Sequence, residues 1–138
     1  MNKRFNKEEI IKAYSDLEQE QSPKGALLGA ILGAVPAAGL FYLFTLMGGT
    51  LLWLIFLPAA LIGFQSAYLG KTFEFKYRLI PALIASLVHA IGLLIIFQTH
   101  SFFLITLPLS FGVAFYFSKR KFDNLQETAM WQKKHGKI

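Results

Sequence analysis

The sequence predicts an all-α integral membrane protein with four transmembrane helices, arranged as two antiparallel hairpins. All fourteen Lys and Arg and all eight Asp and Glu of the 138 residues lie in three short segments, 1–24, 71–78 and 119–138. The two stretches between these segments, residues 25–70 and 79–118, carry no Asp, Glu, Lys or Arg. Because about 20 apolar residues cross a hydrocarbon core of ~30 Å, each stretch is long enough for two helices.

The first segment, residues 1–24, predicts a cytoplasmic amphipathic helix. Asn6 is placed to cap it, with Glu9 at the spacing of a capping box, and the Ser22-Pro23 pair ends it. Its apolar face recurs at helical spacing, at Ile10, Tyr14 and Leu17. Such a helix can lie on the bilayer surface, pack under the bundle or dock on a partner. We favour a solvated helix close to the lipid headgroups.

The four spans are expected at about residues 25–47, 51–69, 79–97 and 102–118. The turns between paired spans, residues 48–50 and 98–101, carry no Asp, Glu, Lys or Arg, whereas all the basic residues flank the opposite ends. Positive charge gathers on the cytoplasmic side of membrane proteins. Both termini and the middle loop are therefore predicted to be cytoplasmic.

The third segment, residues 119–138, is a basic cytoplasmic tail that predicts a second short amphipathic helix. Asp123 is placed to cap this helix and Gly136 to end it. Basic residues of the middle loop and of this tail are expected to contact lipid headgroups. They are Lys71, Lys76, Arg78, Lys119, Arg120 and Lys121.

The net charge of +6 comes from these membrane-flanking segments, so we expect membrane lipid as a partner and no nucleic acid. The chain contains no cysteine, which excludes disulfides and thiolate metal sites. No metal site, cofactor or catalytic triad is apparent, and we expect no enzymatic activity.

Small residues recur one turn apart in the spans, which permits close helix packing in lipid. The predicted packing positions are Gly25, Gly29, Gly33, Ala59, Gly63, Ala67, Thr106, Ser110 and Ala114. A second ridge of alanines in the first span indicates two neighbours for that helix. One neighbour is expected within the bundle; the other lies either in the same bundle or in another subunit.

Proline falls inside three predicted spans, at Pro36, Pro58 and Pro108, where it would kink the helix. Pro81 is expected in the first turn of the third span, where proline costs little. Most proline kinks in membrane helices serve structure, and we expect the same here.

His89 is the one ionisable side chain near the middle of a predicted span, and Ser86 shares its face. Ionisable groups inside membranes are functional candidates, so His89 and Ser86 form a possible ligand or proton site. The alternative is a hydrogen-bonded packing residue. One hypothesis is that His89 donates to the Leu32 carbonyl, which Pro36 frees.

The chain is similar in general form to small four-span proteins of the bacterial inner membrane, which implies that localisation. It lacks the first-span glutamate of small multidrug transporters, and its Phe residues do not reproduce the polar positions of fluoride channels. The leading hypothesis is an accessory subunit, assembly factor or regulator that acts through helix–helix association. The alternatives are a homo-oligomeric channel or transporter with His89 and the proline kinks near its pathway, and a holin or immunity-type protein.

Overall fold

The computed structural model describes residues 5–48, 54–96 and 105–138, and every structural statement below refers to these ranges. The described chain is all-helical, as predicted, and contains no strand. A π-helical turn, η2 (Gly92–Ile96), continues the fourth helix. The six α-helices are α1 (Lys7–Glu20), α2 (Pro23–Leu46), α3 (Leu57–Gly70), α4 (Phe75–Ile91), α5 (Leu107–Phe117) and α6 (Asn124–Lys134).

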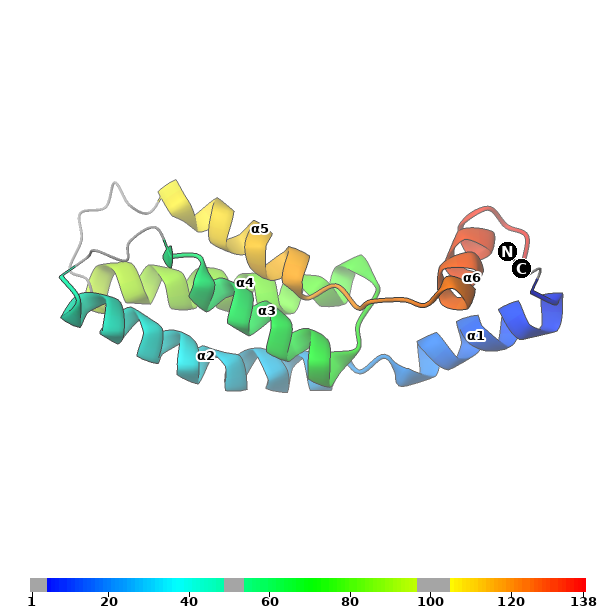
Figure 1. The fold of residues 1–138 in the computed structure, drawn as a ribbon, viewed down its shortest axis with the longest axis horizontal. Coiled ribbons are helices and arrows are strands. Elements are labelled where there is room, and N and C mark those ends of the chain that lie inside the picture. Colours follow the sequence, from blue (N-terminus) through cyan, green and yellow to red (C-terminus); the bar gives the residue numbers. More distant parts are fainter. Residues whose placement is uncertain (1–4, 49–53, 97–104) are drawn as a thin grey trace. The chain divides into compact units, whose positions relative to one another are not determined.

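The helices form two compact units (Figure 1). The bundle unit, Ser22–Arg120, contains α2, α3, α4 and α5. The terminal unit joins the described residues 5–21 to Lys121–Ile138, and it contains α1 and α6.

The bundle unit consists of two antiparallel helix pairs. Ser22 N–H donates to the Gly70 carbonyl at 2.8 Å, which places the start of α2 beside the end of α3. Arg78 Nη2 donates to the Phe115 carbonyl, which places the start of α4 beside the end of α5. Only residues 71–74 separate α3 from α4. All four of these helix ends, which border the charged segments, therefore lie at the same end of the bundle.

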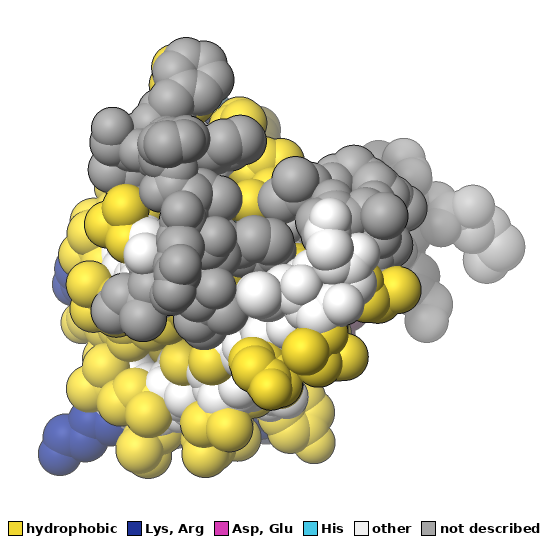
Figure 2. Space-filling model, turned by 90° about the vertical axis from the view of Figure 1, so that its left-hand side faces the viewer, with side chains coloured by type: hydrophobic (Ala, Val, Ile, Leu, Met, Phe, Trp, Pro, Cys, Tyr) yellow, Lys and Arg dark blue, Asp and Glu magenta, His cyan; other side chains and the backbone are white. Residues whose placement is uncertain are grey.

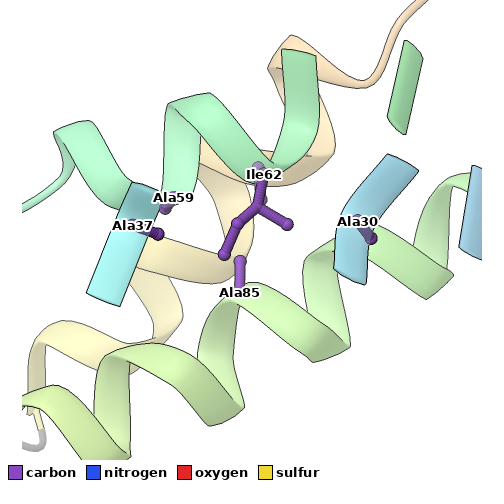
Figure 3. Close-up of a cluster of buried hydrophobic side chains, with 6 residues drawn as sticks. Ala30, Ala37, Ala59, Ile62 and Ala85 are labelled. Carbon is purple, nitrogen blue, oxygen red and sulfur yellow. The ribbon is translucent and has the colours of Figure 1, made fainter. Parts of the chain in front are cut away.

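The core of the bundle unit is built mainly of alanine. Its larger cluster comprises Ala30, Ala37, Ala59, Ile62, Ala85 and Ala114, and a second cluster comprises Phe41, Ile55 and Leu93. Ile62 of α3 extends between α2 and α4 toward Ala85, with Ala30 and Ala37 on either side (Figure 3). Small side chains at these positions allow the helix backbones to approach closely, so the packing is tight although few large side chains are buried.

Two helical segments are long and apolar enough to cross a membrane, namely Pro23–Leu46 and Phe75–Leu94. The other two bundle helices are shorter than the spans predicted for them: α3 has 14 residues and α5 has 11. The predicted turn at residues 98–101 and most of the turn at 48–50 lie outside the described residues.

The proline assignments need correction at three positions. Pro58 and Pro108 lie in the first turns of α3 and α5, so they begin helices and do not kink them. Proline suits this position because the first N–H groups of a helix have no intrahelical acceptor. Pro81, expected in a first turn, lies inside α4 because that helix already begins at Phe75. Pro36 lies inside α2, where it was expected.

The terminal unit contains the two predicted amphipathic helices with their predicted caps. Asn6 N–H donates to Glu9 Oε2 at 2.9 Å in a capping box, and Asp123 Oδ1 accepts from Gln126 N–H at 2.8 Å. Gly136 follows α6 with a positive φ of 65°.

The apolar face of α1 lies against α6, where Ile10 and Ala13 form a buried cluster with Ala129. Contact of this face with the bilayer, one of the alternatives for the first helix, is therefore excluded while the two helices are paired.

Candidate functional site

The glycine face of α2 packs directly on the backbone of α3. A Cβ atom at Gly25 or Gly29 would collide with the carbonyl oxygen of Leu69 or Gln65, respectively. At Gly33 it would lie 2.9 Å from Ile62 Cα, closer than real Cβ atoms approach. The space above these three glycines is therefore filled by α3 of the same chain.

Two residues of α3 that were not among the predicted packing positions complete this contact. Ser66 is fully buried, and its hydroxyl donates to the Ala26 carbonyl at 2.9 Å. A Cβ at Gly70 would lie 2.6 Å from Ala26 Cβ. Helical spacing could have revealed both residues, because Ser66 and Gly70 lie one and two turns after Ile62, on the same face as Ala59.

Four of the six remaining small-residue positions are buried in the bundle, namely Ala59, Gly63, Ser110 and Ala114. A Cβ at Gly63 would lie 2.5 Å from the Ala114 carbonyl oxygen, so α3 and α5 touch there. Ser110 is buried and donates to the Ala85 carbonyl at 3.4 Å, whereas Ala67 is only half-buried.

The second neighbour of α2 is α4, since Ala30 and Ala37 share the core cluster with Ala85. The second neighbour was expected either in the same bundle or in another subunit, and the structure shows it in the same bundle. The glycine ridge of α2 is therefore covered within the chain, whereas the alanine ridge is buried at Ala26 and Ala30 and exposed at Ala38.

His89 forms the main polar contact inside the bundle. Its side chain is 1% exposed, and Nε2 lies 2.7 Å from Thr106 Oγ1, just before α5. Phe56 stacks parallel to the imidazole at 6.2 Å between centroids, and Phe41 approaches edge-on at 5.7 Å. Phe41 reaches this place because Gly92 has no side chain; a Cβ there would lie 2.7 Å from the ring.

The surroundings of His89 differ from the predicted site in two ways. Nε2 is bonded to Thr106, and Nδ1 is buried without a hydrogen-bond partner among the described residues, so donation to the Leu32 carbonyl is wrong. Ser86 donates to the Ala82 carbonyl of its own helix at 2.9 Å, and no hydrogen bond joins it to His89. The enclosed imidazole links α4 to the start of α5 and retains one nitrogen that can take a further partner.

Four of the six basic residues assigned to lipid headgroups are exposed. Lys71, Lys119 and Lys121 are exposed, and Arg120 is half-buried. Lys76 is also exposed and forms an ion pair with Glu74 at 2.9 Å.

Arg78 is turned onto α5 instead. Its guanidinium lies 4.0 Å from the centroid of the Phe115 ring while it donates to the Phe115 carbonyl, which also accepts from Ser118 Oγ at 2.8 Å. Arg78 therefore satisfies a carbonyl in the last turn of α5 and places its positive charge at the negative end of that helix.

Replacing Arg78 by alanine is expected to lower the free energy of unfolding of the bundle by about 1–2 kcal/mol, through loss of the charged hydrogen bond and the cation–π contact. Arg78→Lys is expected to retain only part of the lost free energy of unfolding, because an ammonium group lacks the planar, forked donor geometry of the guanidinium. SDS-induced unfolding in mixed micelles, followed by circular dichroism, measures both. Lys76→Ala is the control, since its ion pair is exposed and should contribute nothing measurable. Equal changes in the free energy of unfolding for Arg78→Ala and Lys76→Ala would contradict a stabilising contact of Arg78 with α5.

The outward surface of the bundle unit is apolar on every helix. Its exposed side chains include Leu28, Val35, Tyr42, Phe64, Leu83, Leu87, Ile105 and Leu109. Viewed end-on, the described side chains are mostly hydrophobic, with Lys and Arg only at the margin (Figure 2).

Two helix glycines, Gly39 of α2 and Gly112 of α5, also lie on this outward surface. A Cβ at either would meet no atom within 4 Å, so internal packing does not require glycine there.

No cluster of three His, Cys, Asp or Glu suited to a metal ion occurs among the residues that the structure describes. Comparison of the chain with protein families, with curated proteins and with solved structures gives no match.

Proposed function

We propose that the chain is a four-span protein of the bacterial inner membrane with both termini in the cytoplasm. In this proposal it is not an enzyme; it binds another membrane protein as an accessory subunit, assembly factor or regulator. The observation that carries the association is the pair of outward glycines, Gly39 and Gly112, whose open surroundings contrast with the filled surroundings of the inward glycines.

The distribution of polarity supports membrane insertion. Each span-length window is only 33% buried, yet both windows are strongly apolar, with mean hydropathies of 2.0 and 1.7. The core helix of a soluble protein is mostly buried, whereas a lipid-facing helix exposes apolar side chains. The charged segments all border one end of the bundle, as expected for the cytoplasmic end.

The two short helices are compatible with four spans if the residues before them take part in the crossing. At 1.5 Å per residue, α3 rises about 21 Å and α5 about 16 Å, less than the ~30 Å hydrocarbon core. The uncharged stretches that contain these helices, residues 25–70 and 79–118, have 46 and 40 residues, enough for two crossings each.

The packing of α1 on α6 supports an even number of crossings. Ile10 of α1 and Ala129 of α6 belong to one buried cluster, so both helices occupy the same side of any membrane that the chain crosses. Two or four crossings satisfy this condition, and three do not.

Four crossings predict a specific labelling pattern, which the absence of cysteine makes simple to test. Single-cysteine variants Met47→Cys and Ser101→Cys should react with a membrane-impermeant maleimide added to intact cells. Lys71→Cys and Lys121→Cys should react only after permeabilisation. Protection of Met47→Cys and Ser101→Cys in intact cells would contradict the four-span topology.

The association is tested by affinity purification at native expression level in mild detergent, followed by native mass spectrometry. We expect a stoichiometric foreign subunit; a second copy of this chain alone would instead favour the homo-oligomeric channel or transporter described below. Since a partner helix would need the space above the outward glycines, Gly39→Leu or Gly112→Leu should remove it. Leu32→Phe is the control, because Leu32 is already a large exposed side chain of α2. A chain that purifies alone as a monomer would contradict the proposal.

A second candidate function is a small homo-oligomeric channel or transporter with His89 near its pathway. The supporting observation is the buried Nδ1, which has no hydrogen-bond partner among the described residues. This candidate requires flux in liposomes that contain the purified chain, and His89→Leu should abolish that flux. Absence of flux from the unmodified chain would remove the candidate.

A further inference from the structure

The outer face of α6 carries an exposed tryptophan surrounded by basic groups. Trp131 is 51% exposed although Ala129, two residues earlier, is fully buried against α1. Lys137 Nζ lies 4.3 Å from the Trp131 ring centroid, and the His135 ring lies 4.4 Å from it. We call Trp131, Lys134, His135 and Lys137 the tryptophan patch.

This arrangement is the reverse of what a helix in water would favour, because α6 buries a methyl group and exposes an indole. A buried tryptophan contributes far more apolar area than an alanine. Exposure of the indole is favourable, however, where the outer face of α6 lies at a boundary between an apolar and an aqueous phase. The lipid headgroup region is such a boundary, and tryptophan is enriched there.

The charges of the patch identify the kind of lipid. Lys134 and Lys137 are both exposed, whereas the nearest acidic side chain along this face is Glu127, one helical turn before Trp131. The short tail Lys121–Ile138 thus has two exposed lysines, Lys134 and Lys137, on the side of its exposed indole. A basic surface of this kind attracts anionic phospholipids, and each lysine near such a surface contributes about 1 kcal/mol.

The chain connections keep the patch close to the bilayer, if the bundle spans it as proposed above. Residues 118–123 join α5 to α6, and they extend at most about 25 Å. Residues 21 and 22 alone join α1 to α2. Both connections are therefore short tethers between the terminal unit and the bundle unit.

We propose that the tryptophan patch binds the headgroups of anionic phospholipids in the bilayer that holds the bundle. This inference rests on the proposed membrane function. The indole enters the interface, and Lys134 and Lys137 pair with lipid phosphates. Lys133 is not part of the patch, since its Nζ lies over the Tyr14 ring of α1 at 5.1 Å.

The test uses the full chain with Trp53→Phe, so that Trp131 is its only tryptophan. The protein is reconstituted in vesicles of phosphatidylcholine alone or of phosphatidylcholine with phosphatidylglycerol. We expect lipids brominated near the headgroup to quench Trp131 strongly in the anionic vesicles, and weakly in the neutral ones or at raised salt.

Lys134→Gln or Lys137→Gln should lower the ratio of lipid-bound to free Trp131 about fivefold. Lys12→Gln, an equal change of charge on α1 among acidic neighbours, should leave the ratio unchanged.

Three results would overturn the proposal. The first is that Trp131 remains accessible to acrylamide in both kinds of vesicle. The second is equal quenching of Trp131 by lipid in both. The third is protection of Trp131 from acrylamide without quenching by lipid. The last result would mean that a protein surface covers the patch.

A second reporter separates this failure from failure of the membrane function. Leu87→Trp in a chain with Trp53→Phe and Trp131→Phe places a tryptophan on the outward face of α4, where Leu87 is 62% exposed. The proposed insertion of the bundle in the membrane requires that lipids brominated deep in their acyl chains quench this reporter. If it is quenched while Trp131 is not, only the lipid contact of the patch is wrong; if neither is quenched, both proposals fail.

Discussion

Gly29→Ala is expected to destabilise the bundle unit by at least about 2–3 kcal/mol, because its new methyl group would collide with the Gln65 carbonyl oxygen. That oxygen belongs to the backbone of α3, so it cannot move without shifting the helix. Separation of α2 from α3 would also weaken the hydrogen bond from Ser66 to the Ala26 carbonyl. SDS-induced unfolding in mixed micelles measures the loss of free energy.

Gly39→Ala is the matched control for this prediction. It makes the same chemical change in the same helix, at a position where the added Cβ meets no atom within 4 Å. Since alanine favours helix over glycine, we expect the free energy of unfolding to stay unchanged or to rise by about 0.5–1 kcal/mol. If Gly29→Ala and Gly39→Ala behave alike, close packing of α2 on α3 is not a source of stability.

Phe41→Ala is expected to lower the free energy of unfolding by about 3 kcal/mol, the usual cost of removing a buried aromatic ring from a core that cannot collapse. Phe41 is fully buried and clusters with Ile55 and Leu93. Its ring also fills the space above Gly92 and borders His89, so the substitution leaves a cavity against both residues.

The control for Phe41→Ala is Leu43→Ala, on the same helix but with a half-exposed side chain. Lipid or detergent can replace the lost contacts at Leu43, so its change in free energy should stay below about 1 kcal/mol. A loss at Leu43 equal to that at Phe41 would indicate that the outward face of α2 is covered by protein.

Local signals in the sequence were sufficient for the helical class, the short amphipathic helices and their caps. Asn6 with Glu9, and Asp123 with Gln126, lie within one turn of helix, so the residues that form each cap are neighbours in the sequence. The close packing of Gly29 is similarly indicated by its spacing from other small residues, although the spacing does not say which helix lies above it.

Other features depend on partners distant in the sequence and could not be predicted. The first turn of a helix and its interior both admit proline in a membrane protein, so the sequence does not decide whether Pro58 begins or kinks a helix. His89 meets Thr106 across 17 residues, and Arg78 meets Phe115 across 37. Helical periodicity identifies a buried face, but the choice of partner depends on the packing of the whole bundle.

The contact between α1 and α6 also determines the order in which the protein can mature during synthesis. The apolar face of α1, with Ile10 and Ala13, leaves the ribosome first, and Ala129 is added more than a hundred residues later. At 5–20 residues per second, this face stays uncovered for roughly 6–24 s. During that interval a chaperone or the membrane surface can bind it. A chain truncated before residue 124 would keep this face exposed permanently, which would mark it for degradation.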